Sequence, residues 1–328
     1  MTLPDPANAL SEAAAREAFS AILDGSCSAD EITAFLVALA DRGETATEIA
    51  AAAKEMRARM IGVDAPANAI DVCGTGGDGS HSLNISTATA LVVAACEIPM
   101  AKHGNRAASS KSGAADTLEA LGLDLAKAAT IGEQSLREIG IAFFFAPNHH
   151  PALGPLAPIR KAIGRRTIFN LLGPLCNPAK VKRQLIGVAS PDLVETYAEA
   201  ALQLGYDKAM IVSGEEGLDE LSISGPSRVA MISDGTVTIS RITPEDAGLT
   251  RHPAEAILGG DAQYNAAALK SLLQGEKSAY RDAVLLNSAA ALMVAGEVDS
   301  WEEGVEEAAE VLDKGLANAM LNCWIANQ

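Results

Sequence analysis

The sequence predicts an α/β protein with a small N-terminal helical domain and a large domain built on a mostly parallel central sheet flanked by helices. Three observations support this. The first 62 residues carry only helical patterns, short apolar strands alternate with helices from residue 69 onward, and a glycine-rich loop follows the first strand. Such alternation is typical of parallel sheets. We place the helical domain at residues 1–66, joined by helices from about 155–175, and the α/β domain at 67–328.

Composition narrows the function. Hydrophobic residues make up 48% of the 328 residues, so a large core can form, and the net charge of −17 argues against nucleic acid and anionic membranes as partners. The five cysteines form no CxxC pair, which disfavours a disulfide framework or a zinc site. The N-terminus lacks a signal-peptide pattern, and no apolar run reaches membrane-spanning length. We therefore expect a soluble cytoplasmic protein.

Capping patterns mark the N-terminal helices. Ser28 with Glu31 and Thr45 with Glu48 each match a capping box, in which the side chains satisfy the first backbone N–H groups of a helix. Gly43 lies where the first of these helices is expected to end. Gly62 is expected to end the second, ahead of a linker.

The α/β domain follows in order. Strands are expected within 69–77, 98–104, 141–147, 183–190 and 208–214, and helices within 86–98, 112–122 and 191–205. Residues 228–244 contain an Asp-Gly turn between alternating apolar runs and predict a hairpin or a pair of adjacent strands. From about residue 265 the pattern is helical again.

The segment "GTGGDGSHSLNIST", residues 74–87, is the strongest candidate for a phosphate site. Glycines after a strand let several backbone N–H groups approach one anion, and the following helix start adds positive dipole. Asn84, Ser86 and Thr87 add hydrogen-bonding groups there. The segment is no Walker A loop, and Asp78 would repel the pyrophosphate of a bound dinucleotide. The alternative is a tight turn with a simple helix cap.

A basic segment, "KHGNRAASSKSG" at residues 102–113, follows the next expected strand. Lys102, Arg106 and Lys111 could neutralise phosphate, with Ser110 as a further hydrogen-bonding group. The alternative is a solvated basic turn. Its position one strand–helix unit after the glycine loop favours the phosphate site, because ligands of open α/β sheets collect at the carboxyl ends of neighbouring strands.

Two further segments supply candidate ligand residues. Asp219 and Glu220 follow the strand expected at 208–214, and paired carboxylates at a strand end suit magnesium; an acidic surface loop is the alternative. The proline-rich stretch 145–179 is expected to form a shaped connection. Within it, Arg160 either faces a substrate carboxylate or is a solvated arginine, and composition alone does not decide between them.

Together these motifs resemble the anthranilate phosphoribosyltransferase family of tryptophan biosynthesis. The resemblance rests on "DVCGTGGDG", "NIST", "KHGNRAASSKSGAADTLEALG", "FAPNHHPA", "RTIFNLLGPLCNPA" and "GLDELS", and it covers nearly the whole chain. It implies the nucleoside phosphorylase/phosphoribosyltransferase type of fold. The implied reaction transfers 5-phosphoribosyl from 5-phosphoribosyl-1-pyrophosphate to the amine of anthranilate and releases pyrophosphate. It also implies a homodimer that uses Mg²⁺, with two ions.

The resemblance assigns roles residue by residue, with no general base. Anthranilate would meet Gly74, Asn105 and Arg160, and the metal would meet Ser86, Asp219 and Glu220. The phosphoribosyl donor would be bound by Gly74, Thr75, Gly76, Gly77, Asp78, Ser82, Asn84, Ser86, Thr87, Lys102, His103, Gly104, Asn105, Arg106 and Ser110. One departure is Ser82-Leu83, where the family pattern has a Thr-Phe pair; it affects only the side-chain packing expected of the loop.

Two alternatives remain on this fold. A pyrimidine nucleoside phosphorylase would share the Lys, Arg and Ser pattern, but its glycine loop differs and it carries an extra C-terminal domain. A non-catalytic relative that binds nucleic acid is the second, and the acidic net charge and the Asp219–Glu220 pair disfavour it.

Overall fold

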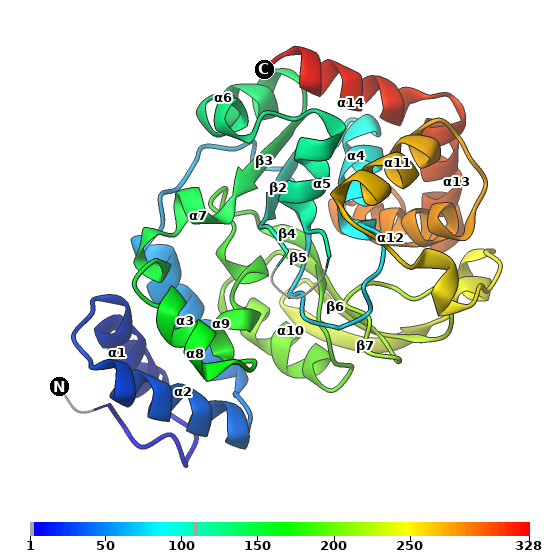
Figure 1. The fold of residues 1–328 in the computed structure, drawn as a ribbon. Coiled ribbons are helices and arrows are strands. Elements are labelled where there is room, and N and C mark those ends of the chain that lie inside the picture. The colour runs from blue at the N-terminus through cyan, green and yellow to red at the C-terminus, as the bar shows by residue number, and fades with distance from the viewer. Residues whose placement is uncertain (1–2, 108–110) are drawn as a thin grey trace.

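A computed structural model describes residues 3–107 and 111–328, and it places a small helical part beside a larger α/β part (Figure 1). In the described chain seven strands form one sheet in the order β3-β2-β1-β4-β5-β6-β7, and the first five are parallel. The predicted fold class is confirmed. The strands are β1 (Ile70–Gly74), β2 (Met100–Gly104), β3 (Ile141–Phe145), β4 (Arg183–Gly187), β5 (Lys208–Gly214), β6 (Ser227–Ser233) and β7 (Thr236–Ile242).

The last two strands form the predicted hairpin. β6 pairs antiparallel with β5 and with β7, which ends the sheet. Asp234 and Gly235 both have positive φ, at 52° and 73°, as the two central residues of a tight I′-type hairpin turn require.

The strands contribute side chains to hydrophobic cores on both faces of the sheet. In β5, Met210 and Val212 belong to one hydrophobic cluster, whereas Ala209 and Ile211 belong to the other, as the two-residue period of a strand dictates. Helices α4 and α12 pack on the first face, and α10 packs on the second. The helices of this part are α4 (Ile85–Ala95), α5 (Ala114–Leu121), α6 (Leu125–Glu138), α10 (Leu193–Gln203), α11 (Ala262–Leu273), α12 (Ala279–Ala295), α13 (Trp301–Asp313) and α14 (Leu316–Ala326).

The sequence patterns did not single out α6. Its N-cap is Asp124, whose side chain accepts hydrogen bonds from two backbone N–H groups of the first turn. In the described residues no helix is long and apolar enough to cross a membrane.

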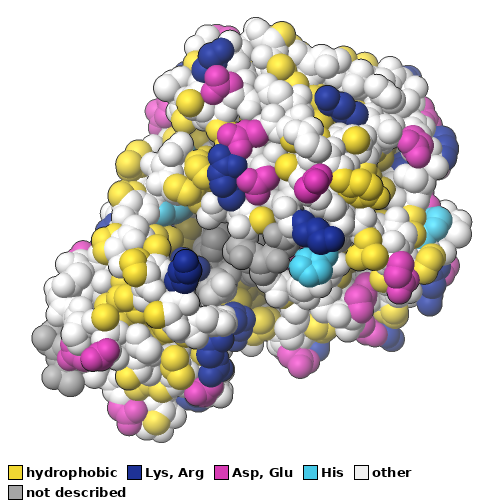
Figure 2. All heavy atoms as spheres, in the orientation of Figure 1, with side chains coloured by type: hydrophobic (Ala, Val, Ile, Leu, Met, Phe, Trp, Pro, Cys, Tyr) yellow, Lys and Arg dark blue, Asp and Glu magenta, His cyan; other side chains and the backbone are white. Residues whose placement is uncertain are grey.

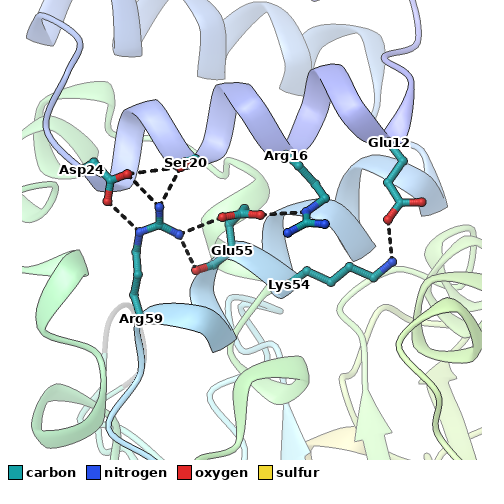
Figure 3. Close-up of polar contacts among 7 residues, drawn as sticks. All are labelled: Glu12, Arg16, Ser20, Asp24, Lys54, Glu55 and Arg59. Carbon is teal, nitrogen blue, oxygen red and sulfur yellow. Dashed lines mark hydrogen bonds and ion pairs between the residues drawn. The ribbon is translucent and has the colours of Figure 1, made fainter.

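The N-terminal helices are α1 (Glu12–Leu23), α2 (Ala29–Arg42) and α3 (Ala46–Arg59). Both predicted capping boxes form at Ser28 and Thr45, and Gly43 ends α2 with φ at 92°. The predicted end of α3 at Gly62 is wrong by a few residues, because the helix stops at Arg59 and its C-cap, Met60, is already extended. Helices α1 and α3 lie side by side and are joined by ion pairs (Figure 3).

The stretch 145–179 contains the short helices α7 (Ala146–His149), α8 (Ala157–Ile163) and α9 (Ile168–Leu171). Helices α8 and α9 pack against α2. Core residues of α1–α3 and α9 form one continuous cluster with α10 and with one face of the sheet. The helical part is therefore fixed to the sheet through α10. The exact domain boundary at residues 66 and 67 stays a prediction.

Candidate active site

A cleft of about 850 Å³ lies at the carboxyl ends of β1 and β2, where the α/β part faces α8 and α9. Figure 2 shows Lys and Arg side chains gathered along the hollow between the two parts of the molecule. Sixteen predicted site residues line the cleft: Gly74, Thr75, Gly76, Gly77, Asp78, Ser82, Asn84, Ser86, Lys102, His103, Gly104, Asn105, Arg106, Arg160, Asp219 and Glu220.

The glycine loop leaves β1 at Gly74 and turns with positive φ at Gly76, Gly77 and Gly79, a conformation that side chains disfavour. The N–H of Gly76 donates to Oδ2 of Asp219 over 2.7 Å. The loop therefore already binds the Asp219 carboxylate through the backbone amide of Gly76.

Close approach of the acidic segment depends on two glycines. A Cβ on Gly74 would overlap the Asp219 carboxylate, and a Cβ on Gly187, at the end of β4, would overlap the Asp219 backbone carbonyl. The absence of these side chains lets the segment that carries Asp219 cross directly over the ends of β1 and β4.

Asp219 and Glu220 are acidic groups without a matching set of cations. Burial raises the pKa of Asp219 to about 7, and the negative charge of Asp78 adds to the effect. Burial raises the pKa of Glu220 to about 8, with the Asp219 charge adding to it, and Lys102 and Ser86 oppose the increase only in part. A bound cation would strongly stabilise the charged form of such a closely spaced acidic pair.

Helix α4 begins at this pair. The backbone N–H of Ser86 donates to Oε1 of Glu220 over 3.1 Å, and the Ser86 hydroxyl also bonds to that carboxylate. The N-cap residue Asn84 makes no side-chain bond to its own helix. The N-terminus of α4 therefore faces the cleft with Glu220, and not its own N-cap residue, as the side-chain acceptor, and it adds positive dipole there.

Lys102 and His103 extend from the end of β2. Lys102 is only 2% exposed, and its Nζ donates to the carbonyl of Val72 over 2.8 Å. Burial, with the nearby His150 and His149, lowers the pKa of His103 to about 3, so its ring is neutral. The cleft floor thus combines one buried cation with a neutral imidazole.

The arginines of the helical side differ in their partners. Arg165 and Arg166 form ion pairs with Asp41 and Glu44 at 2.7 and 2.8 Å. Arg160, on α8, instead has its guanidinium 5.9 Å from the ring centroid of Phe169, and burial lowers its pKa. Among the described residues no carboxylate pairs with Arg160, so its charge is free for an anionic group in the cleft.

Three predicted residues lie differently from expectation, and one lies outside the described residues. Thr87 is 1% exposed and does not line the cleft. Arg106 lines it, but its guanidinium pairs with Asp116 at 2.8 Å and with Glu119. The Asn84 side chain is bound to Thr117 and Asn265. Ser110 lies outside the described residues.

Sequence reasoning missed a buried polar network beneath β2. Asp71 is fully buried, and its carboxylate accepts hydrogen bonds from the His103 N–H at 3.1 Å, from Asn177 at 2.8 Å and from Gln184 at 3.0 Å. Burial raises its pKa to about 6, against the charge of Lys102. The available signal was an aspartate inside an apolar strand, because a buried acid needs several partners.

Sequence comparisons agree with this geometry. The a/b domain of the glycosyl transferase family matches residues 66–318, and the helical bundle domain matches residues 6–60. Anthranilate phosphoribosyltransferases from Novosphingobium aromaticivorans and Sphingopyxis alaskensis are 63% and 61% identical to this chain, over 99% and 98% of its length and 98% and 97% of theirs. The chain belongs to the anthranilate phosphoribosyltransferase family.

Solved structures of the family carry the same architecture. The anthranilate phosphoribosyltransferase from Thermus thermophilus matches with a TM-score of 0.92 at 43% identity, over 98% of this chain and 96% of that one. Anthranilate phosphoribosyltransferase from Saccharomyces cerevisiae in complex with PRPP and Mg matches with a TM-score of 0.88 at 30% identity, over 97% and 94%. The predicted family and its enzymatic function are confirmed. The roles of individual residues stay predictions.

Proposed function

We propose that this chain transfers 5-phosphoribosyl from 5-phosphoribosyl-1-pyrophosphate to the amine of anthranilate in the cleft described above, as its family does in tryptophan biosynthesis. The observation that carries the proposal is the contact of Asp219 with the loop Gly74–Gly79 and of Glu220 with Ser86, in the same cleft as Arg160. Within the described part of the chain, Arg160 pairs with no carboxylate. One side of the cleft suits a diphosphate with a cation, and the other suits an aromatic carboxylate.

The donor binds against the backbone amides of Gly77 and Gly79 and the start of α4. Breaking the bond from the anomeric carbon to the pyrophosphate oxygen leaves negative charge on the leaving group. In this proposal the N–H groups of the glycine loop and the buried Lys102 stabilise that charge.

Magnesium fits this end of the cleft. Among the described residues no group of three or more His, Cys, Asp or Glu side chains forms a complete ligand set. Asp219, Glu220 and the Ser86 hydroxyl would hold the ion, which typically completes its shell with water and phosphate oxygens. Bound there, Mg²⁺ neutralises pyrophosphate charge. The resemblance supports two ions and a homodimer as further parts of the proposal, and the cysteine usage supports a cytoplasmic location.

Anthranilate binds at the opposite wall. Arg160 pairs with its carboxylate, and Asn105 and Gly74 line the space beside the anomeric carbon. An aromatic amine is neutral at pH 7 and nucleophilic, so the site needs no strong base. The rate enhancement comes from placing the amine close to the anomeric carbon.

A fluorescence assay tests the proposal. Anthranilate fluorescence should fall when the enzyme, the donor and Mg²⁺ are combined, and it should persist when any one is omitted. Phosphorolysis of thymidine by inorganic phosphate is the contrasting reaction. Activity there without anthranilate consumption would contradict the assignment.

A further inference from the structure

A group of partly buried hydrogen bonds lies behind the glycine loop, and it includes residues that have no part in the proposed chemistry. Its centre is Asn265, on α11, which is 2% exposed and does not line the cleft. Its Nδ2 donates to Oδ1 of Asn84 over 2.9 Å, and its own Oδ1 accepts from the N–H of Gly260 over 2.8 Å. Asn265 therefore ties the helix-cap residue Asn84 to a segment more than 170 positions away in the chain.

The segment 257–260 in turn holds the second half of the donor loop. The N–H of Leu83 donates to Ile257 and the N–H of Gly259 donates to His81, each over 2.8 Å. Ser82 and Leu258 form an isolated antiparallel bridge between these bonds. The loop is thus fastened from behind by backbone pairing, and Asn265 fixes the end of that pairing at Gly260.

The Asn84 side chain is occupied from two sides. Besides the bond from Asn265, its Oδ1 accepts from the hydroxyl of Thr117, on α5, over 2.5 Å. An asparagine at an N-cap ordinarily accepts a backbone N–H from the first turn of its own helix. Here that acceptor is taken by Thr117 and Asn265, and Asn84 makes no side-chain bond to α4.

We infer that Asn265 is a positioning residue of the donor site: together with Thr117 it fixes the cleft-lining side chain of Asn84 at the start of α4, and through Gly260 it fastens the segment behind the donor loop. The inference rests on the proposed function, because it takes this helix start to be where the donor binds. Loss of Asn265 frees the Asn84 side chain and the segment behind the loop, so the donor then meets a site that is no longer held in place.

Two uncharged variants test the inference. Asn265→Leu removes both bonds while keeping the branched shape of the side chain. Thr117→Val removes the other donor to Asn84, and with it the bond of Thr117 to the Ser112 hydroxyl, without changing shape. We expect Asn265→Leu to raise the KM for the donor about tenfold and Thr117→Val about threefold, because each removes a hydrogen bond that fixes the Asn84 side chain. The KM for anthranilate should stay within about twofold in both, as it reports the opposite wall.

A buried serine provides the matched control. Ser135, on α6, is 4% exposed and donates to the carbonyl of Ile141 over 2.7 Å, at the start of β3. Ser135→Ala breaks a buried hydrogen bond, so it should lower the Tm without changing the KM for the donor. An unchanged donor KM in both test variants, or an equal rise for both substrates, overturns the inference. Should Asn265→Leu fail to fold, Thr117→Val alone decides it.

The proposed function is tested separately in the same series. A wild-type enzyme that consumes no anthranilate contradicts the function before any variant is compared. An active wild type with unaltered variants contradicts only the role of Asn265.

Discussion

The carboxylates of α1 and α3 and those of the cleft are the same chemical groups in opposite circumstances. On the helices, Glu55 bonds to Arg16 at 2.7 Å and to Arg59 at 2.8 Å, and Arg59 also reaches Asp24 (Figure 3). Burial disfavours the charge of Glu55, but the two arginines outweigh it and lower its pKa.

In the cleft, Asp219 and Glu220 meet each other and Asp78, and their pKa values rise. The contrast shows where negative charge stabilises the folded protein and where it is kept unbalanced for a ligand. Each prediction below separates these two uses of a carboxylate.

Among the changes to a carboxylate or to its partner, the largest effect is expected from Glu220→Gln. The amide keeps the shape and can still accept from Ser86, but it removes the charge that a cation needs. We expect kcat/KM to fall by about a hundredfold, the scale of losing one preorganised electrostatic group. In EDTA above about pH 8, where the wild-type Glu220 is ionised, the variant should melt at a higher temperature than wild type, because like-charge repulsion is relieved. Full activity, or a lower Tm in EDTA, would contradict the view that the cleft carboxylates serve a ligand whereas the helical carboxylates stabilise the fold.

Arg160→Ala should have the next largest effect. The KM for anthranilate should rise about 10- to 100-fold, the range for a lost charge-assisted hydrogen bond, while the KM for the donor changes little. Arg165→Ala is the control, because Arg165 already pairs with Asp41. Steady-state kinetics with each substrate varied provide the measurement, and equal damage to both KM values would refute the role of Arg160.

The cleft carboxylates should change the stability of the protein with pH in the opposite sense to Glu55 on the helices, whose pKa is lowered. Because the folded-state pKa values of Asp219 and Glu220 are raised, the folded chain binds extra protons, and this stability is fully present below about pH 4. It is lost as the pH rises through about 7 and 8. Relative to Glu220→Gln, the Mg-free wild type should lose a few degrees of Tm across that window. Adding Mg²⁺ should reverse the loss, and parallel pH curves would contradict the assignment.

The smallest effects are expected on the helices. Arg59→Ala breaks two ion pairs of a mostly buried guanidinium and should cost about 1 kcal/mol of unfolding free energy. Arg16 is half exposed, so Arg16→Ala should cost less than about 0.5 kcal/mol. Denaturant unfolding measures both, and the kcat of each variant should stay within about twofold of wild type. A large loss of activity would mean that the helical carboxylates also serve the site.

Local signals predicted much of the fold. The capping boxes at Ser28 and Thr45, the Asp234-Gly235 turn and the alternating strands all depend on neighbouring residues, and the structure contains each of them. The end of α3 was misplaced, because Gly62 suggested a stop that the chain reaches sooner. Helix α6 escaped notice because no motif drew attention to it.

The site was harder to predict wherever partners are distant in the chain. The glycine loop and the Asp219–Glu220 pair were visible as motifs, whereas the pairing of Arg106 with Asp116 and Glu119 was not. The network around Asp71 and the bonds of Asn265 to Asn84 link segments far apart in sequence. A single sequence does not show which distant segments come close together, so these contacts could be identified only from the structure.

Gly187 shows that the acidic segment around Asp219 restricts the side chains allowed outside the cleft. It touches no proposed substrate group, yet even one methyl at this position would overlap the carbonyl of Asp219. Gly187→Ala should therefore behave in a growing cell like loss of the enzyme, and a strain carrying it should need tryptophan in its medium. Libraries built to accept new aromatic amines should vary the wall around Arg160 and leave this glycine untouched.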